Sequence, residues 1–331
     1  MKRIRMLAAL LILLTIALAG CSTAKPYKET KFLMDTVIEI TAYGPNAEEA
    51  VKDAFAEFKR VQRLSDKFDA NSQLSQINRA AGVGKMAVDP DLALMIDRSA
   101  KMSRLSQGKF DITIGALTEL WGVGHKGEYV PSLRDIKQIL PLVDYRLIDL
   151  DSAHNTVFLT KSGMALDLGG IAKRYAIEKA LEKLHGHGIH SALINAGGDI
   201  SVIGNKPDNT PWRIGLQHPR KADGLLARIT LDQWNTVETS GDYQRYFIKD
   251  GVRYAHILDP HTGVQPSEIA SVTLISKNNS ADIRSSAVFV LGIDKGLELL
   301  AQYPGTEAII VGTDGRIIVT PGLGSSVEIE K

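Results

Sequence analysis

The chain has 331 residues, of which 44% are hydrophobic and 23% are charged, and its formal net charge at pH 7 is +1. This is the composition of an ordinary globular protein, long enough for one large domain or two smaller ones. A nearly neutral chain lacks the basic surface that nucleic-acid binding requires, and a single cysteine, Cys21, excludes an internal disulfide and a cysteine-rich metal site.

Residues 1–20 have the pattern of a secretory signal. Basic residues near the start precede an apolar run over 6–19, which is too short for a comfortable membrane span. Small residues stand directly before Cys21, an arrangement that resembles a bacterial lipoprotein signal with Cys21 as the lipidated first residue of the mature chain. A plain secretory signal or an N-terminal anchor is the alternative.

Cleavage before Cys21 would leave 36 basic residues, the 39 of the whole chain less three, against 38 acidic ones, a net charge of about −2. The lipid would then tether the protein outside the cytoplasmic membrane of a bacterium, on the periplasmic side. Ser22 gives no Asp-type signal for retention in the inner membrane. Residues 21–30 are expected to form the tether and 31–331 the folded domain.

Regular elements are expected along the whole domain. Apolar residues three and four positions apart predict helices over 47–64, 91–105, 172–184 and 282–299, and Ser132 with Asp135 has the spacing of a capping box for a further one. Alternating and β-branched residues predict strands at 32–42, 145–150, 156–160, 212–217, 225–231, 246–249, 252–258, 271–275, 308–311 and 317–319, with a polar turn at 239–243. The segment 192–203 is predicted to form two strands separated by Gly197-Gly198. Most adjacent strands are joined as hairpins, so the expected fold is one α+β domain with mixed or antiparallel sheets and flanking helices.

The segment 166–176 stands out because a short apolar stretch containing Asp167 runs into Gly169 and Gly170 and then into a helical pattern. Two glycines before a helix let the backbone approach a bulky ligand, and the free N–H groups of the helix start suit a phosphate or diphosphate. A turn that merely packs the helix closely against a strand is the alternative.

Asp282, Ser285 and Ser286 lie three and four residues apart and share one face of a helical turn. A carboxylate, hydroxyls and a backbone carbonyl form an oxygen-only set, the kind of ligand that magnesium prefers. The alternative is an acidic residue that stabilises a helix start, followed by two surface serines.

His256 lies in an apolar strand just before a turn. It is either a buried structural histidine or a general base, because its ordinary pKa lies near neutral pH. The chain contains no P-loop, no nucleophile elbow and no dinucleotide fingerprint, so the chemistry of those classes is unsupported.

Together these segments resemble the ApbE family of FAD:protein FMN transferases, the flavin transferases. Their order and spacing carry the resemblance rather than any one motif. The matching segments are 34–36, 65–72, 110–113, 121–122, 167–176, 195–199, 239–243, 256–263, 281–282, 286 and 290–292.

The resemblance implies a single ApbE-like domain related to the T-fold, with FAD as substrate and Mg²⁺ as cofactor. The FMN part would be moved onto a threonine or serine hydroxyl of an acceptor protein, such as a redox-pump or respiratory flavoprotein subunit, and AMP released. By position, the metal ligands would be the Gly170 carbonyl, Asp282 and Ser286, with Ser285 close by, and His256 the catalytic base. The implied FAD contacts are Met34, Phe68, Lys109, Phe110, Asp111, Asp167, Lys173 and Leu258.

The chain departs from the family pattern at four positions. Asp35 and Arg174 stand where glycine is common, Ser286 replaces a threonine, and Arg284 enters an otherwise uncharged stretch. Serine keeps the hydroxyl ligand, whereas the new charges are expected to alter FAD affinity or the choice of acceptor. Two rival readings stay open at this point: an FAD diphosphatase that uses water as the acceptor, and a flavin-binding lipoprotein without turnover. The sequence also leaves open whether the protein forms a homodimer.

Overall fold

The computed structural model describes residues 25–277 and 283–330. The signal over 1–20, the lipidation site Cys21 and the ligand candidate Asp282 therefore lie outside the described residues. Within the described ranges, no helix combines the length and apolar character needed to cross a membrane.

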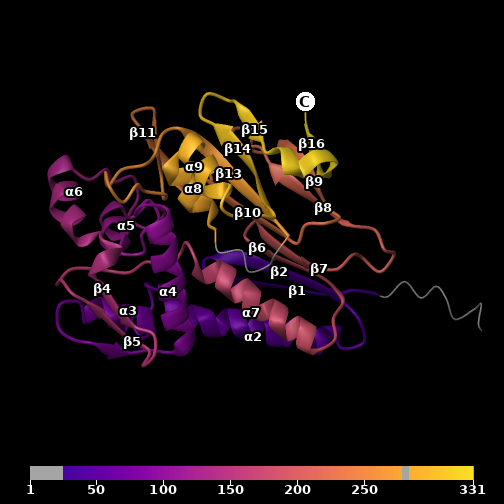
Figure 1. The fold of residues 1–331 in the computed structure, drawn as a ribbon, viewed down its shortest axis with the longest axis horizontal. Helices are drawn as coiled ribbons and strands as arrows, with labels where there is room; N and C mark the ends of the chain where they lie inside the picture. The colour runs from indigo at the N-terminus through magenta and orange to yellow at the C-terminus, as the bar shows by residue number, and fades with distance from the viewer. Residues whose placement is uncertain (1–24, 278–282, 331) are drawn as a thin grey trace, which may run out of the picture.

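An eight-stranded sheet forms the centre of the molecule, and every neighbouring pair of its strands is antiparallel (Figure 1). In spatial order its strands are β1 (Tyr27–Leu33), β2 (Thr36–Tyr43), β6 (Ser191–Ala196), β7 (Asp199–Ile203), β10 (Thr236–Gly241), β13 (Ile269–Ser276), β14 (Thr306–Gly312) and β15 (Ile317–Val319). All eight residues of β13 are buried, the polar Ser271, Thr273 and Ser276 included, because a core packs against each face of the sheet at this strand.

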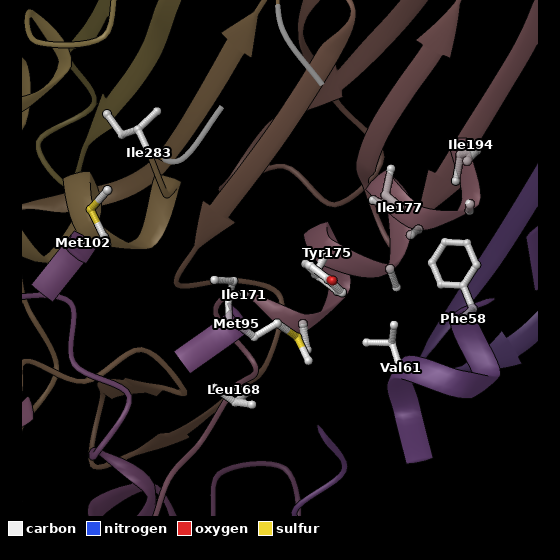
Figure 2. Packing of buried hydrophobic residues seen from close by; sticks show 14 of the residues in the cluster. Phe58, Val61, Met95, Met102, Leu168, Ile171, Tyr175, Ile177, Ile194 and Ile283 are labelled. Carbon is white, nitrogen blue, oxygen red and sulfur yellow. The ribbon is translucent and has the colours of Figure 1, made fainter. Parts of the chain in front are cut away.

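The main core lies on the face of the sheet that the long helices cover. Helices α2 (Ala47–Ser65) and α7 (Ala172–Gly186) pack along each other on β1, β2 and β6. Figure 2 shows Phe58 and Val61 of α2 facing Ile177 of α7, close to Ile194 of β6. Helices α8 (Ser285–Leu291) and α9 (Ile293–Leu300) cover β10, β13 and β14 on the same core.

A second core forms on the opposite face, under the small sheet of β8 (Trp212–Gln217), β9 (Leu225–Leu231) and β16 (Val327–Ile329). The remaining elements form a lobe at one end of the central sheet (Figure 1). They are α3 (Gln73–Arg79), β3 (Met86–Ala87), α4 (Pro90–Leu105), α5 (Gly115–Trp121), α6 (Leu133–Ile139), β4 (Ile148–Asp151), β5 (Thr156–Leu159), β11 (Tyr246–Lys249) and β12 (Val252–Ala255), with 3₁₀ turns at Leu140–Leu142 and Tyr145–Leu147. A third 3₁₀ turn, Pro321–Ser326, lies beside β9, β14 and β16.

The architecture confirms the expected α+β fold with antiparallel sheets, and most strands and helices lie where the sequence predicted them. The capping box is also present, since the Ser132 hydroxyl accepts a hydrogen bond from the Asp135 amide. The predicted strand over 32–42 is instead a hairpin, because Met34 and Asp35 form a tight turn with φ of 52° and 60°. Its first strand begins at Tyr27, so the tether predicted over 21–30 ends earlier than expected.

Three further predictions were wrong in local structure. Residues 145–147, predicted as strand, form a 3₁₀ turn before β4. The first residues of the predicted turn at 239–243 belong to strand β10, because their polar side chains form hydrogen bonds with neighbouring elements. The helix predicted over 282–299 is two helices, because Gly292 between them adopts φ of 84°, outside the helical region.

Candidate functional site

A cavity of about 1360 Å³ opens between the central sheet and the lobe. Its walls come from the β1–β2 turn, the loop after α2, α5, the segment before α7, the β6–β7 turn, β8 and residues 243–258. The volume exceeds the range of about 300–1,000 Å³ that drug-sized ligands occupy, so the cavity can hold a dinucleotide.

Six of the predicted site residues line this cavity: Met34, Phe68, Asp167, Lys173, His256 and Leu258. They come from four segments that are far apart in the sequence, and the fold brings them to one space. The other six described candidates lie outside the lining: Lys109, Phe110, Asp111, Gly170, Ser285 and Ser286.

The carboxylate of Asp167 is held by two side chains that face the same cavity. Lys67 Nζ lies 2.6 Å and Thr118 Oγ1 2.9 Å from Asp167 Oδ2, and the Gly169 amide donates to Oδ1 at 2.9 Å. Burial alone would raise the pKa of this carboxyl, but Lys67 and the hydrogen bonds hold it below its ordinary value. Asp167 therefore enters the cavity as an anion with a fixed orientation.

Lys173, in the first turn of α7, is also held by an acid. Its Nζ lies 2.8 Å from Asp199 Oδ2, at the start of β7. Burial raises the pKa of Asp199, and the neighbouring Glu238 raises it further, against the opposing effect of Lys173. The ammonium group is thereby oriented at the cavity wall next to the N-terminus of a 15-residue helix, where backbone N–H groups favour an anionic ligand.

His256 is half-buried, and its imidazole contacts the backbone across the hairpin. Nδ1 lies 3.3 Å from the Arg245 carbonyl oxygen, so the tautomer that donates from Nδ1 leaves the lone pair of Nε2 available as a proton acceptor. Burial and the nearby Arg245 guanidinium lower the pKa of His256 to about 4. The imidazole is therefore neutral at pH 7, which is the form that a general base requires.

Gly170 and Ser286 are 116 positions apart in the sequence but adjacent in the fold. A Cβ atom built on Gly170 would lie 3.8 Å from Ser286 Oγ and 2.8 Å from Cε2 of the Phe110 ring. Glycine is thus required at this point of close approach. The structure brings Gly170 and the hydroxyl of Ser286 together, with the Phe110 ring packed against Gly170 rather than exposed in the cavity.

Lys109 and Asp111 both bind other groups of the protein. Lys109 Nζ lies 2.6 Å from Asp259 Oδ2. The Asp111 carboxylate accepts hydrogen bonds from Thr113 and from the Tyr145 amide, and burial raises its pKa. In this structure, Lys109 thus joins its loop to the segment from His256 to Gly263, whereas Asp111 holds its own loop and the start of the turn at Tyr145.

The donor set fits a hard cation. Within 25–277 and 283–330, no group of three or more His, Cys, Asp or Glu residues could hold a metal ion. The Gly170 carbonyl and the Ser286 hydroxyl are neutral oxygen donors on two segments that are distant in the sequence and meet at Gly170. Magnesium is commonly held by few protein oxygens and completed by water and substrate phosphates, so the residues present are compatible with it.

Several cavity residues were not found from the sequence. Lys67 and Thr118 hold Asp167, Arg245 faces His256, and His125 lies 4.4 Å from the Phe68 ring between ring centroids. Their partners lie 11 to 100 positions away in the chain, so no local pattern marks them. For Lys67 the one available signal was its place beside Phe68 in a polar loop.

Comparisons with known proteins find similar sequences over nearly the whole chain. The sequence model of the ApbE family matches residues 34–310. The FAD:protein FMN transferase of Klebsiella pneumoniae (strain 342) is 34% identical and covers 90% of this chain and 93% of its own length, and that of Treponema pallidum (strain Nichols) is 30% identical with 94% and 91% covered.

Among solved structures, the ApbE protein of Thermotoga maritima superimposes with a TM-score of 0.83 at 33% identity, covering 91% of this chain and 99% of its own. The Pseudomonas stutzeri flavinyl transferase ApbE, in its apo form, gives 0.80 at 29% identity, with 92% and 97% covered.

Proposed function

The chain belongs to the ApbE family, and we propose that it is an FAD:protein FMN transferase, which moves the FMN part of FAD onto a threonine or serine hydroxyl of an acceptor protein and releases AMP. The observation that carries the assignment within the site is His256, a neutral imidazole with an available Nε2 at the wall of a dinucleotide-sized cavity.

FAD fits the chemistry of the cavity wall. The exposed ring of Phe68 offers a stacking surface for a planar ring system. The Asp167 carboxylate is an oriented acceptor for an amino or imino group of a flavin or adenine ring. Lys173 and the start of α7 supply the positive field that the diphosphate requires.

The transfer replaces one phosphorus–oxygen bond by another. The acceptor oxygen forms a bond to the FMN phosphorus, the bond from that phosphorus to the bridging oxygen breaks, and the electron pair leaves with AMP. His256 Nε2 takes the proton of the acceptor hydroxyl, a contribution of roughly 10²–10⁴-fold in rate. Lys173 orients the diphosphate, since positioning and charge stabilisation supply most of the catalysis in phosphoryl-type transfer.

We propose magnesium as the cofactor of this site. The Gly170 carbonyl and the Ser286 hydroxyl would hold it, together with Asp282, which lies outside the described residues. When bound, the ion would neutralise charge on the diphosphate and stabilise the leaving AMP.

The pattern of the N-terminal residues bears on where in the cell the reaction takes place. We propose that Cys21 is lipidated and that the domain works outside the cytoplasmic membrane, near membrane-bound flavoprotein subunits that carry the acceptor hydroxyl. Globomycin-sensitive processing and a lipid-modified N-terminal peptide would support this proposal, and an unprocessed N-terminus would refute it.

Incubation of the protein with FAD and Mg²⁺, with and without an acceptor protein, tests the function. A transferase releases AMP together with flavin attached to the acceptor, whereas a diphosphatase releases FMN and AMP without an acceptor. Retention of intact FAD under both conditions would instead indicate a flavin-binding protein and would overturn the proposal.

A further inference from the structure

Helix α8 begins against a carboxylate of the central sheet, Glu238 of β10. The amide and the hydroxyl of Ser285 both donate to Glu238 Oε1 at 2.8 Å, and Arg284 Nη1 donates to Oε2 at 3.0 Å. Ser285 Oγ also lies 2.8 Å from Ser240 Oγ. Because the Ser285 proton goes to the carboxylate, Ser240 is the donor in this second bond. Four hydrogen bonds therefore join the start of α8 to one strand.

The charges around Glu238 explain why an acid can occupy this position. Burial raises the pKa of its carboxyl, but Arg284, the Ser285 amide and Arg174 together hold it below its ordinary value. Arg174 is itself buried, donates to Ser201 Oγ at 2.7 Å, and has a pKa lowered to about 10, chiefly by burial. The two arginines that depart from the family pattern thus act on the same carboxylate, which compensates part of the cost of burying them.

The bonds at Ser285 decide where the next residue points. Successive residues of an α-helix are rotated by about 100°, so a helix whose Ser285 faces Glu238 and Ser240 presents Ser286 to a different neighbour. That neighbour is Gly170, whose constructed Cβ lies 3.8 Å from Ser286 Oγ. A rotation of α8 would move the Ser286 hydroxyl away from the Gly170 segment.

We propose that Glu238 is a positioning residue for the magnesium site: it fixes the rotation of α8 through Ser285, so that the Ser286 hydroxyl faces Gly170. Ser285 is then part of this positioning contact rather than a metal ligand, since its hydroxyl is buried and already engaged by Glu238 and Ser240. The inference rests on the proposed function, because it requires that Ser286 and Gly170 contribute to metal binding.

The test compares substitutions at Ser285, Ser286 and Glu238. Mg²⁺ is titrated into FAD turnover by wild type, Ser286→Ala, Ser285→Ala, Glu238→Gln and Glu238→Ala, and the Mg²⁺ concentration for half-maximal rate is measured separately from the rate at saturating Mg²⁺. We expect Ser286→Ala to lower both the apparent Mg²⁺ affinity and the saturating rate. Ser285→Ala and Glu238→Ala should raise the half-maximal Mg²⁺ concentration about fivefold or more, with the rate at saturating Mg²⁺ within about twofold of wild type. Glu238→Gln keeps the acceptor oxygen for Ser285, so it should raise the half-maximal Mg²⁺ concentration less.

A second readout does not depend on turnover. In the His256→Ala background, the rise in Tm that Mg²⁺ causes with FAD present should be smaller with Ser285→Ala or Glu238→Ala than without either substitution. Glu178→Ala is the matched control, because it removes a bidentate ion pair with Arg98 from helix α7 without touching α8. It should lower Tm and leave the half-maximal Mg²⁺ concentration unchanged.

The outcomes separate the two proposals. If wild type transfers flavin equally well with and without Mg²⁺, the metal site and the positioning role both fail, while the transfer function stands. If wild type requires Mg²⁺ and Ser286→Ala weakens its use, but Ser285→Ala and Glu238→Ala match the Glu178→Ala control, Glu238 does not position the site. If Ser285→Ala reduces the saturating rate as strongly as Ser286→Ala does, Ser285 acts as a ligand and the inference is wrong.

Discussion

Gly170→Ala tests the contact between the start of α7 and the start of α8. A Cβ at this position would lie 2.8 Å from Cε2 and 3.3 Å from Cζ of the buried Phe110 ring. Carbon atoms in contact prefer about 3.5–4.0 Å, so the ring or the backbone must move by about 0.7 Å or more. Such overpacking typically costs about 1–3 kcal/mol.

Part of that cost is offset because alanine restricts the unfolded chain, by about 0.4–1 kcal/mol. The net loss is therefore between about 0 and 2.6 kcal/mol with a midpoint of about 1.3 kcal/mol. For a domain of this size, the midpoint corresponds to a fall in Tm on the order of 2–4 °C. The effect on activity should be larger, because a displacement of about 1 Å at a site that positions reacting groups can lower the rate about 10²-fold.

Thermal unfolding and AMP release from FAD measure the two effects. Gly186→Ala is the control: this glycine ends the same helix, and its added Cβ would meet no heavy atom within 4 Å. It should be neutral or stabilising by up to about 1 kcal/mol and fully active. Wild-type activity and Tm in Gly170→Ala would refute the close contact between Gly170, Phe110 and Ser286.

Three further predictions concern the base and the cavity wall. His256→Ala should bind FAD with unchanged affinity, measured by flavin fluorescence, and lose roughly 10²–10⁴-fold in transfer, because the hydroxyl keeps its proton; transfer at the wild-type rate would show that another group is the base. Burial lowers the pKa of His256 to about 4, so its neutral form persists as the pH falls. We therefore expect kcat/KM to stay level from about pH 8 to 5 and to decline near pH 4. A decline in kcat/KM with its midpoint between about pH 6 and 7 would contradict the assignment of His256 as the base. Lys67→Met removes the cation 2.6 Å from Asp167, so the pKa of Asp167 should rise and the Kd for FAD should increase about tenfold, or about 1.4 kcal/mol. The control Lys85→Met removes an exposed ion pair with Asp149 and should leave the Kd for FAD unchanged. Equal Kd values in the two variants would refute the role of Lys67.

The elements with strong local signals could be predicted from the sequence. Apolar periodicity predicted the positions of α2, α4 and α7, because each of these helices has one buried face. The Gly197-Gly198 pair predicted the turn between β6 and β7, because both glycines adopt a positive φ there. The Met34-Asp35 turn was missed for the opposite reason, since a positive φ is uncommon outside glycine, although Asp adopts it more readily than most residues. Asp35 occupying a common glycine position agrees with that backbone geometry.

The sequence identified several residues of the site but not the side chains that hold them in place. Asp167, Lys173 and His256 do line one cavity, but their partners Lys67, Asp199 and Arg245 depend on how distant segments pack. Ser285 and Ser286 could not be told apart from their spacing. Their different surroundings follow from Glu238, which lies 47 positions before Ser285 in a strand whose neighbours the sequence does not reveal.

Mass spectrometry of an acceptor protein co-expressed with this chain tests the central claim most directly. We predict that one threonine or serine peptide gains the mass of the FMN group when the wild-type chain is present, and that the gain disappears with His256→Ala. An acceptor that stays unmodified while FAD is converted to FMN and AMP, or a full gain of mass with His256→Ala, would contradict it.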